Sequence, residues 1–531
     1  MSFKDWFRSD AERLGRAVPS LLMPEPAAST VAVSHDPKRA QDVLNRLPRG
    51  ADVIRDQIDR KERARWARPN EIAAFRYQPG HAVLGKHHGH LIGIGDDKPM
   101  VTVASARSGK TSTVLKPTLY TYPGSMVVLD PKGELASATA RHRREVIGQR
   151  VGVIDPFRCS NQPAASFNPL AELDPAALSI LDDVDLLCET IILDEGGADG
   201  SHWTNSARAL LRGLMLHVLQ LPESERNLTT VRQLLTLTHS SLLAAQKQLE
   251  ANGSKDPAEA AQNALFMEMA AQGNAFGGAL AGAGNSFLRK APRERSSIVS
   301  TAETQTRFLD SLPLQAALRS SDVSLADLVD RPTTIYICLP SSHMTTHFRW
   351  LRIVVRLALM ALEKRGTWPL GKPHILFLME EFATLGHMPI MEQAAAYFPG
   401  FGVKLWAVLQ DLGQLRRHYK ASHQTFLGNA GVLQFFSNSD KESLDFISDR
   451  LGSLSFVRGK FGAADDDKAR DYVDKERLLY PHEAAEGFAR ATGSQLLIVD
   501  GQPPMAIERL TFEDVEQVRM ATAMQPVPSR R

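Results

Sequence analysis

Six short apolar runs constrain the fold of this chain more than any other feature. They are continuous rather than alternating, and they read "MVTVASA", "SMVVLDPKGE", "RVGVIDP", "TTIYICLP", "HILFLMEEF" and "VKLWAVLQD". Continuous apolar runs are typical of parallel strands that are buried on both faces of a sheet. Because helical stretches separate these runs, the sequence predicts an α/β fold with a mostly parallel sheet and reactive loops at the carboxyl ends of its strands.

The strand pattern stops between about residues 169 and 331, where stretches such as "SARALLRGLMLHVLQ" keep a helical period. We therefore expect one α/β domain in two parts, residues 96–175 and 331–531, interrupted by an all-α insertion at 176–330. Residues 1–50 are expected to form an N-terminal helix and linker, and residues 51–95 an accessory segment. A stretch rich in Gly and Ala, "AAQGNAFGGALAGAGNSF", is compatible with a flexible loop, a close-packed helix of small residues or a disordered connector.

The segment "VTVASARSGKTST" at residues 101–113 comes close to the phosphate-loop pattern G-x-x-x-x-G-K-[ST]. The pattern requires glycine at position 104, and this chain has Ala104. A buried strand precedes the segment and a helical stretch follows it, which is the context that the motif needs. Since position 104 has only to tolerate the entry conformation of the loop, the sequence predicts a phosphate-binding loop.

Each residue type in this loop suits an anionic ligand. Gly109 lets the backbone approach the phosphates, Lys110 reaches the β and γ phosphates, and the Thr111 hydroxyl is suited to ligate magnesium. ATP and Mg²⁺ are therefore the expected cofactors. The expected nucleotide-binding residues of the loop are Ala106, Arg107, Ser108, Gly109, Lys110, Thr111 and Ser112.

A second apolar run, "ILFLMEEF", ends in two adjacent carboxylates. A phosphate-loop enzyme needs an acidic residue at a neighbouring strand end for magnesium and a second carboxylate that polarises water. We expect Glu380 to hold the metal, although an aspartate is usual there, and Glu381 to act as general base. The alternative is a pair of ordinary surface carboxylates at a strand end.

Overall charge places a limit on nucleic-acid binding. Lysine and arginine number 62 against 60 acidic residues, for a net charge of +2, so any DNA-binding surface must be local. The three cysteines, Cys159, Cys188 and Cys338, lie far apart in the sequence without a C-x-x-C pair. Their spacing predicts neither a disulfide framework nor a zinc site, and a reducing cytosol fits it best.

Membrane contact is expected to be peripheral. No apolar stretch approaches the roughly 18 residues that a membrane span needs, and "WLRIVVRLALMAL" carries two arginines and is typical of a buried amphipathic helix. The first 18 residues have an apolar face beside basic residues. Two interpretations stay open for them, a helix on a membrane surface and a helix packed on its own domain or on a partner.

From about Ala64 onwards the chain resembles the TraG/TraD-like coupling proteins of conjugation and type IV secretion, which are relatives of hexameric DNA-pumping ATPases. The resemblance rests on ordered blocks that include "ARWARPNEI", "ASARSGKTS", "PGSMVVLDPKGELASATA", "HWTNSARALLRGL", "ERSSIVSTAETQTRFLD", "LFLMEEFATLGHMP" and "LGNAGVLQFFSNSDKES". It implies a RecA-like motor domain interrupted by an all-α domain. It also implies a homo-hexameric ring whose channel admits DNA.

The resemblance also implies residue roles. It assigns Gln410, at the end of "LWAVL", as the glutamine that senses the γ-phosphate, and it places Asp130 and Lys132 in a block beside the nucleotide. Together with Lys110 and Glu381, Gln410 completes the expected catalytic set, while Thr111 and Glu380 are the expected metal ligands. The position of Gln410 at the end of an apolar strand also suits a hydrogen bond to a phosphate or to the attacking water, and the alternative is a capping residue that has no catalytic role.

Two departures from the family pattern affect the expected mechanism. Many relatives have an arginine shortly before the sensor strand, whereas this chain reads "YFPGFGVKLW". Either another residue such as Arg416 or Arg450 serves as the arginine finger, or hydrolysis is slow. The usual pair of N-terminal membrane helices is also missing, so we expect a cytoplasmic protein that reaches the inner membrane, if at all, through a partner.

Two basic clusters are candidates for contact with DNA phosphates, since six copies in a ring multiply a few cations per subunit. An ordinary solvated surface is the alternative for both. The first cluster is Lys290, Arg293 and Arg295, and the second is Arg416, Arg417 and Lys420.

The sequence thus predicts an ATPase that delivers DNA, or a protein–DNA substrate, to a type IV secretion or conjugation machinery. Its expected partners are DNA, relaxase or secretion-machinery proteins, and further copies of itself. Two other functions remain open. One is a DNA translocase without a link to secretion, and the other is a weakly hydrolysing nucleotide-binding adaptor that recruits relaxase or an effector.

Overall fold

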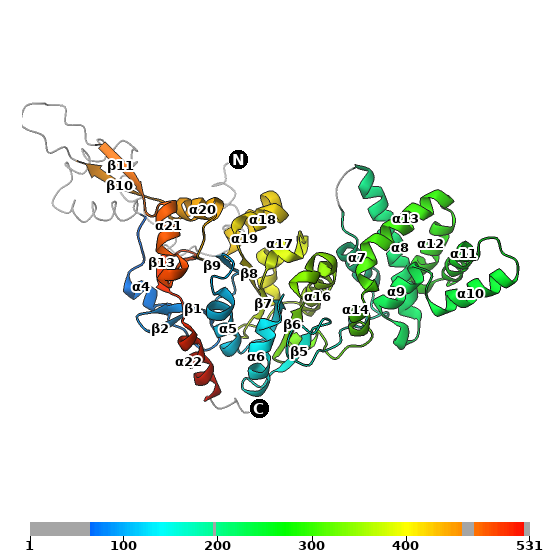
Figure 1. Cartoon of the computed structure of the whole chain (residues 1–531), viewed down its shortest axis with the longest axis horizontal. Coiled ribbons are helices and arrows are strands. Elements are labelled where there is room, and N and C mark those ends of the chain that lie inside the picture. The colour runs from blue at the N-terminus through cyan, green and yellow to red at the C-terminus, as the bar shows by residue number, and fades with distance from the viewer. Residues whose placement is uncertain (1–63, 195–197, 459–471, 525–531) are drawn as a thin grey trace, which may run out of the picture. The chain divides into compact units, whose positions relative to one another are not determined.

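The computed structural model describes residues 64–194, 198–458 and 472–524 (Figure 1). The chain divides into two compact units, one made of Arg65–Leu451 and Leu479–Arg531, the other of Met1–Ala64 and Gly452–Leu478. The described part of the smaller unit is an antiparallel hairpin of β10 (Ser453–Arg458) and β11 (Tyr472–Arg477). The predicted N-terminal helix and linker lie outside the described residues.

An eleven-stranded sheet organises the larger unit, in the order β2-β1-β13-β12-β9-β3-β8-β7-β4-β6-β5. The seven strands from β9 to β5 run parallel to one another, which confirms the predicted α/β class with a mostly parallel sheet. These strands are β3 (Met100–Ala104), β4 (Met126–Asp130), β5 (Arg150–Ile154), β6 (Thr333–Cys338), β7 (Ile375–Met379), β8 (Val403–Leu409) and β9 (Val432–Phe436).

Four antiparallel strands extend one side of the sheet. The stretch "HAVLGKHHGHLIGIG" forms a hairpin, which pairs through β1 with β13 from the C-terminal part of the chain. Sequence patterns did not predict β9, β12 or β13. The antiparallel strands are β1 (Ala82–His87), β2 (His90–Ile94), β12 (Ser494–Val499) and β13 (Met505–Glu508).

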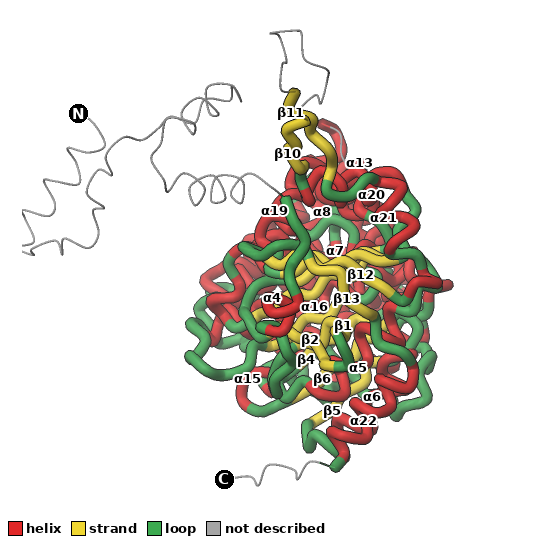
Figure 2. Tube along the Cα trace, turned by 90° about the vertical axis from the view of Figure 1, so that its left-hand side faces the viewer, coloured by secondary structure: helices red, strands yellow, loops and turns green. Residues whose placement is uncertain are grey.

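Helices lie on both sides of the sheet (Figure 2), which explains why its central strands are continuous apolar runs. Every residue of β3, β4, β6, β7 and β8 is buried. The α-helices of this unit outside the segment between β5 and β6 are α4 (Pro69–Ala73), α5 (Lys116–Thr121), α6 (Glu134–Glu145), α16 (Met344–Arg365), α17 (Pro389–Ala396), α18 (Leu412–Tyr419), α19 (His423–Asn429), α20 (Lys441–Leu451), α21 (Pro481–Gly487) and α22 (Phe512–Ala523).

The apolar stretch "WLRIVVRLALMAL" lies within α16 and is buried, as its composition predicts. Its Arg352 is only 4% exposed, and Nη1 donates to the backbone oxygens of Leu385 and His387, both at 2.7 Å. The cation is therefore held by backbone acceptors of the domain. Over the described ranges, no helix has the length and hydropathy of a membrane span.

A chain of buried hydrogen bonds crosses four neighbouring strands. Trp406 Nε1 donates to Thr102 Oγ1 at 2.8 Å, and that hydroxyl donates to Gln434 Oε1 at 2.7 Å. Gln434 Nε2 in turn donates to Gln495 Oε1 at 2.6 Å. Because a buried polar group without a partner is costly, this network favours the order β8-β3-β9-β12 over other pairings.

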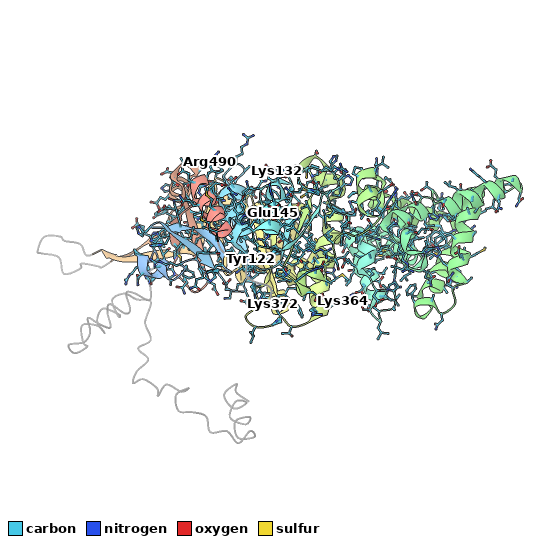
Figure 3. All side chains as sticks on the ribbon, turned by 90° about the horizontal axis from the view of Figure 1, so that it is seen from below. Tyr122, Lys132, Glu145, Lys364, Lys372 and Arg490 are labelled. Atoms are coloured by element: carbon cyan, nitrogen blue, oxygen red, sulfur yellow. The ribbon has the colours of Figure 1, made fainter. Side chains whose placement is uncertain are left out.

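Between β5 and β6 the described residues form helices and no strand. Lys364 of α16 binds Asp183 of α7 at 2.6 Å (Lys364 is labelled in Figure 3). The α-helices of this segment, mostly green in Figure 1, are α7 (Ile180–Ile191), α8 (Ala198–Gln220), α9 (Leu228–Leu235), α10 (Ser240–Ala251), α11 (Pro257–Ala270), α12 (Ala279–Leu288), α13 (Pro292–Thr306), α14 (Leu312–Ala317) and α15 (Asp327–Asp330).

The second half of the stretch rich in Gly and Ala, from Ala279 on, forms a close-packed helix, which was one of the three possibilities left open, whereas residues 271–278 before it form turns. Its α12 lies against α11, where the rings of Phe266 and Phe287 stack with centroids 3.9 Å apart. A Cβ on Gly284 would lie 2.5 Å from the backbone oxygen of Phe266. Glycine is therefore required there for the two helices to approach.

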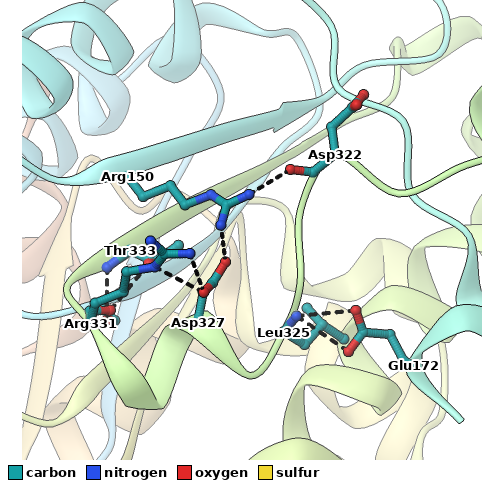
Figure 4. A network of polar contacts seen from close by, with 8 residues as sticks. Arg150, Glu172, Asp322, Leu325, Asp327, Arg331 and Thr333 are labelled. Atoms are coloured by element: carbon teal, nitrogen blue, oxygen red, sulfur yellow. Dashed lines mark hydrogen bonds and ion pairs between the residues drawn. The ribbon is translucent and has the colours of Figure 1, made fainter. Parts of the chain in front are cut away.

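Ion pairs and hydrogen bonds link the start of β5 to the residues that lead from the helical segment into β6 (Figure 4). Arg150, at the start of β5, donates to Asp327 Oδ2 at 2.6 Å and to the backbone oxygen of Asp322 at 2.9 Å. Arg331 donates to the other oxygen of Asp327 at 2.7 and 2.9 Å. One aspartate thus joins the first residue of β5 to the chain that enters β6.

Candidate functional site

The predicted phosphate loop lies between β3 and a helix, as the motif requires. Ala104 is the last residue of β3 and pairs in register with Phe436 of β9, so the missing glycine leaves the strand intact. Arg107 and Gly109 have φ angles of 59° and 93°, in the region that favours glycine. A π-helical turn at Lys110–Leu115 follows and continues into α5.

Two contacts that sequence analysis missed hold this loop in place. Arg509, which follows β13, donates from Nη1 to the backbone oxygen of Ser108 at 2.8 Å and from Nη2 to that of Arg490 at 2.6 Å. Its guanidinium also lies over the Phe436 ring, 5.0 Å from the centroid. In the second contact, Ser105 Oγ donates to the Ser437 backbone oxygen at 2.5 Å.

The side chains of Lys110 and Thr111 in this loop face the two carboxylates that follow β7. Lys110 is 7% exposed, and its Nζ lies 3.5 Å from Glu381 Oε1 and 3.4 Å from the Ala104 backbone oxygen. Thr111 Oγ1 donates to Glu380 Oε1 at 2.5 Å. The loop after β3 and the end of β7 therefore meet although 269 positions separate Thr111 from Glu380.

Glu381 also contacts the end of β8, the strand between β3 and β7. Gln410 Nε2 donates to both oxygens of Glu381, at 3.1 and 2.9 Å, while its backbone NH donates to Gln414 Oε1 at 3.0 Å. Glu381 itself has φ 58° and ψ 49°, a left-handed conformation that costs energy for a residue with a side chain. The strained turn directs the Glu381 carboxylate towards Lys110 and Gln410.

Burial shifts the ionisation of the acidic groups at this edge. It raises the pKa of Glu380 to about 7; the Thr111 hydrogen bond acts in the opposite direction, and the charges of Asp130 and Glu381 raise the pKa further. Burial likewise raises the pKa of Asp130 to about 6, although the backbone hydrogen bonds from Ala136 and its neighbours lower that pKa. The site therefore accumulates carboxyl groups that are costly to ionise without a cation.

The other predicted residues lie at varying distance from this cluster. Asp130 ends β4 and accepts from the Ala136 NH at 2.7 Å. Ser112 lies half-buried on the π-helical turn, whereas Ala106 and Arg107 are exposed. Lys132 is also exposed (Figure 3).

Several of the basic residues that were expected to contact DNA or to act as the arginine finger have acidic neighbours. Arg416 of α18 binds Glu442 at 3.1 Å, and Arg450, Arg417 and Lys420 are exposed. In the other basic cluster, Lys290 binds Glu294 at 2.5 Å and Arg295 binds Glu259 at 3.0 Å, while Arg293 is exposed. Assigning an arginine finger or a DNA contact to any of these residues remains a prediction.

Comparison with known protein sequences gives a consistent answer. The family model described as "Type IV secretory system Conjugative DNA transfer" matches residues 55–529. A conjugal transfer protein TraG of Escherichia coli is 25% identical over 518 residues, covering 88% of this chain and 78% of the relative. The type IV secretion system-coupling protein VirD4 of Bartonella quintana is 24% identical and covers 78% of this chain and 62% of the relative.

Solved structures show the same fold. The conjugative coupling protein TrwBdeltaN70 in its unbound monoclinic form superposes with a TM-score of 0.60 at 14% identity, covering 84% of this chain and 93% of that one. TrwB in complex with ADP and Mg²⁺ gives a TM-score of 0.59 at 15% identity over the same 84% and 93%. With its family model matched from residue 55 to residue 529, the chain belongs to the conjugative DNA transfer family of type IV secretory systems.

Proposed function

We propose that this chain is an ATP-hydrolysing coupling protein that moves DNA, or a DNA–protein substrate, towards a type IV secretion channel. One observation carries the proposal. In a chain of the conjugative DNA transfer family, the carboxyl ends of three adjacent strands bring together a buried lysine, a hydroxyl, two carboxylates and an amide. They are Lys110, Thr111, Glu380, Glu381 and Gln410.

The chemistry of this donor set fits a nucleotide and magnesium. The Lys110 ammonium is nearly buried, yet its nearest carboxylate oxygen is 3.5 Å away, longer than the 2.7–2.9 Å of a strong charge-assisted hydrogen bond. A phosphate oxygen would satisfy this cation. Thr111 and Glu380 would hold Mg²⁺, and the related TrwB is known in complex with ADP and Mg²⁺. When bound, the metal supplies positive charge that stabilises the phosphate oxygens.

The remaining side chains are suited to hydrolysis. Glu381 would accept a proton from the attacking water, and Gln410 would hold the Glu381 carboxylate in position through its two hydrogen bonds. The Lys110 ammonium would move from Glu381 to the terminal phosphates when ATP enters. That transfer leaves the Glu381 carboxylate free to act as a base, so nucleotide binding would itself prepare the general base.

DNA transfer requires an assembly and partners beyond one chain. We expect a homo-hexameric ring in which exposed cations such as Arg293 and Arg417 contact phosphates without reading sequence. Relaxase or secretion-machinery proteins are the expected partners, and contact with the inner membrane would come through one of them. Membership of the DNA transfer family supports this part of the proposal.

The deciding experiment measures steady-state ATP hydrolysis across a protein concentration series, with and without single- and double-stranded DNA. We expect turnover that DNA stimulates and that rises with protein concentration. Lys110→Ala should abolish it, and Glu381→Gln should lower it by about 10²–10⁴-fold. As a matched control, Lys98→Ala removes an exposed lysine that binds Asp500 and should leave turnover unchanged.

The same experiment distinguishes a second candidate, a nucleotide-binding adaptor. That reading is favoured by Pro399 and Phe401, which occupy the stretch before β8 where many relatives have an arginine. Nucleotide binding that Lys110→Ala removes, without turnover at any protein or DNA concentration, would reject the motor and establish the adaptor.

A further inference from the structure

Three neighbouring strands place a thiol and two carboxyl groups side by side at their carboxyl ends. The strands are β4, β6 and β5, with β6 in the middle. Asp130 of β4 pairs in register with Cys338 of β6. Ile154 of β5 pairs with Ile337, so the next residue, Asp155, comes level with Cys338. The register of the strands therefore places the Cys338 thiol between the carboxylates of Asp130 and Asp155.

A tight turn brings a second thiol to the same point. The Arg158 NH donates to the Asp155 backbone oxygen at 3.2 Å, and Arg158 has φ 52°. The chain thus reverses, and Cys159 donates to Asp155 Oδ1 from its backbone NH at 3.0 Å and from its thiol at 3.4 Å. The ligand atoms of Asp155, Cys159 and Cys338 all lie within 4.8 Å of one another.

The Asp155 carboxylate is held in a fixed orientation. Its Oδ2 accepts from the NH and the hydroxyl of Ser160, both at 2.7 Å. Asp155 is 1% exposed and Cys338 is fully buried, whereas Cys159 is partly exposed. Hydrogen bonds that orient a carboxylate in this way are a regular feature of metal sites. Cys159 provides the route from solvent.

A second carboxylate lies close to the Cys338 thiol. Cys338 Sγ lies 3.9 Å from Asp130 Oδ2, so the thiol has a carboxylate from each neighbouring strand beside it. A cation bound among these groups would be attracted by both carboxylates.

We propose that Asp155, Cys159 and Cys338 form a binding site for a soft divalent transition-metal ion of the zinc class. Two sulfur ligands and one carboxylate are a donor set that zinc accepts, and thiolates disfavour magnesium and calcium. On binding, each thiol releases its proton to solvent and forms one sulfur–metal bond. The metal takes the place of the proton between Cys159 Sγ and Asp155 Oδ1, and Asp130 or a water fills the fourth position.

The test uses the full-length, tag-free chain, reduced and stripped of metal, without nucleotide. Cd²⁺ is added, and binding is followed by the ultraviolet thiolate-to-metal absorption and by counting bound ions after dialysis. One tightly bound ion per chain with a thiolate signal is expected. Cys338→Ser and Cys159→Ser should each weaken binding by more than the ~10–100-fold that follows loss of an orienting residue.

Cys188→Ser is the matched control, because Cys188 is a buried thiol on α7 whose Sγ lies 3.9 Å from Met215 Sδ. It should bind as the wild type does. Because Cys159 is partly exposed, Cys159→Ser should still fold, and it tests the site even if the buried Cys338→Ser change prevents folding. A reduced wild type without a thiolate signal, or unchanged binding in Cys159→Ser, overturns the proposal. Both readouts are independent of ATP hydrolysis, so the proposed function and this site can fail separately.

Discussion

The side-chain amide of Gln410 donates to both carboxylate oxygens of Glu381, and Lys110 approaches one of the same oxygens at 3.5 Å. A single carboxylate therefore joins the ends of β7 and β8 to the phosphate loop. Because the amide holds the carboxylate on one side, Glu381 and Gln410 should act as a unit in hydrolysis.

Glu381→Gln should lower ATP turnover by about 10²–10⁴-fold, the usual effect of losing a general base, while nucleotide binding persists. Gln410→Ala should lower it less, and the double variant should be little worse than Glu381→Gln. Single-turnover hydrolysis with the four proteins measures the coupling. Gln424→Ala changes an exposed amide on α19 and serves as the control. Strictly additive losses would show that the two residues act independently.

The buried Glu380 carboxyl should make the metal-free protein less stable as pH rises. Its pKa is raised from 4.5 to about 7, so between these values the folded state binds more protons than the unfolded state, and the free energy of unfolding falls with pH. The difference corresponds to about 3 kcal/mol at most.

Urea denaturation at pH 4.5 and pH 7.5 measures this slope. Glu380→Gln should flatten it, although Asp130, whose pKa is raised to about 6, retains its own contribution. Glu145→Gln, an exposed residue bound to Arg141, should leave the slope as it is. A slope that Glu380→Gln does not alter would contradict the shifted pKa.

Arg509 should affect nucleotide affinity although it lies outside every recognised motif. Arg509→Ala removes the bonds to the Ser108 and Arg490 oxygens, and a bond from a charged donor contributes about 1.5–3 kcal/mol. We expect ATP-analogue binding to weaken by about 10–100-fold in calorimetric titration. Arg519→Ala removes a partly exposed arginine of α22 that is bound to Glu516, and this variant should bind the analogue normally. Normal binding by Arg509→Ala would mean that the loop keeps its shape unaided.

Two glycines on α12 offer a matched test of helix packing. Gly284→Ala forces a Cβ to within 2.5 Å of a backbone oxygen and should destabilise the protein by about 1–3 kcal/mol. Gly282→Ala meets open space in the same helix and should stabilise it by up to about 1 kcal/mol. Chemical denaturation compares the two variants. Equal effects would show that α11 and α12 do not pack closely.

Sequence patterns predicted the parts of the fold that local chemistry determines. Six strands were visible because both of their faces are buried, and the phosphate loop was visible because its residues are consecutive. In contrast, β9 and β12 each carry a buried glutamine, Gln434 and Gln495, which interrupts the apolar run. The short β13 alternates between buried and exposed residues. Only the sheet around these strands makes their conformation favourable.

Contacts between distant residues could not be predicted from sequence. Arg509 reaches Ser108 across 401 positions, and Cys159 meets Cys338 only because the entire helical segment lies between two neighbouring strands. Rules for cysteine sites depend on short spacings, and no such spacing is present here. The motif was sufficient to predict that Glu380 and Glu381 lie beside the phosphate loop. The hydrogen bonds that Thr111 and Gln410 donate to these carboxylates were seen only in the structure.

The anchor supplied by Arg509 has a consequence for synthesis of the chain. The ribosome makes the phosphate loop early, but the arginine that fixes it, and the strands β8 and β9 that flank β3, emerge much later. Because domains fold as units during translation, this domain cannot complete its sheet until the C-terminal strands have left the ribosome. A nascent or truncated chain would therefore carry the recognisable motif without a finished nucleotide site, which delays ATP capture until the molecule is complete.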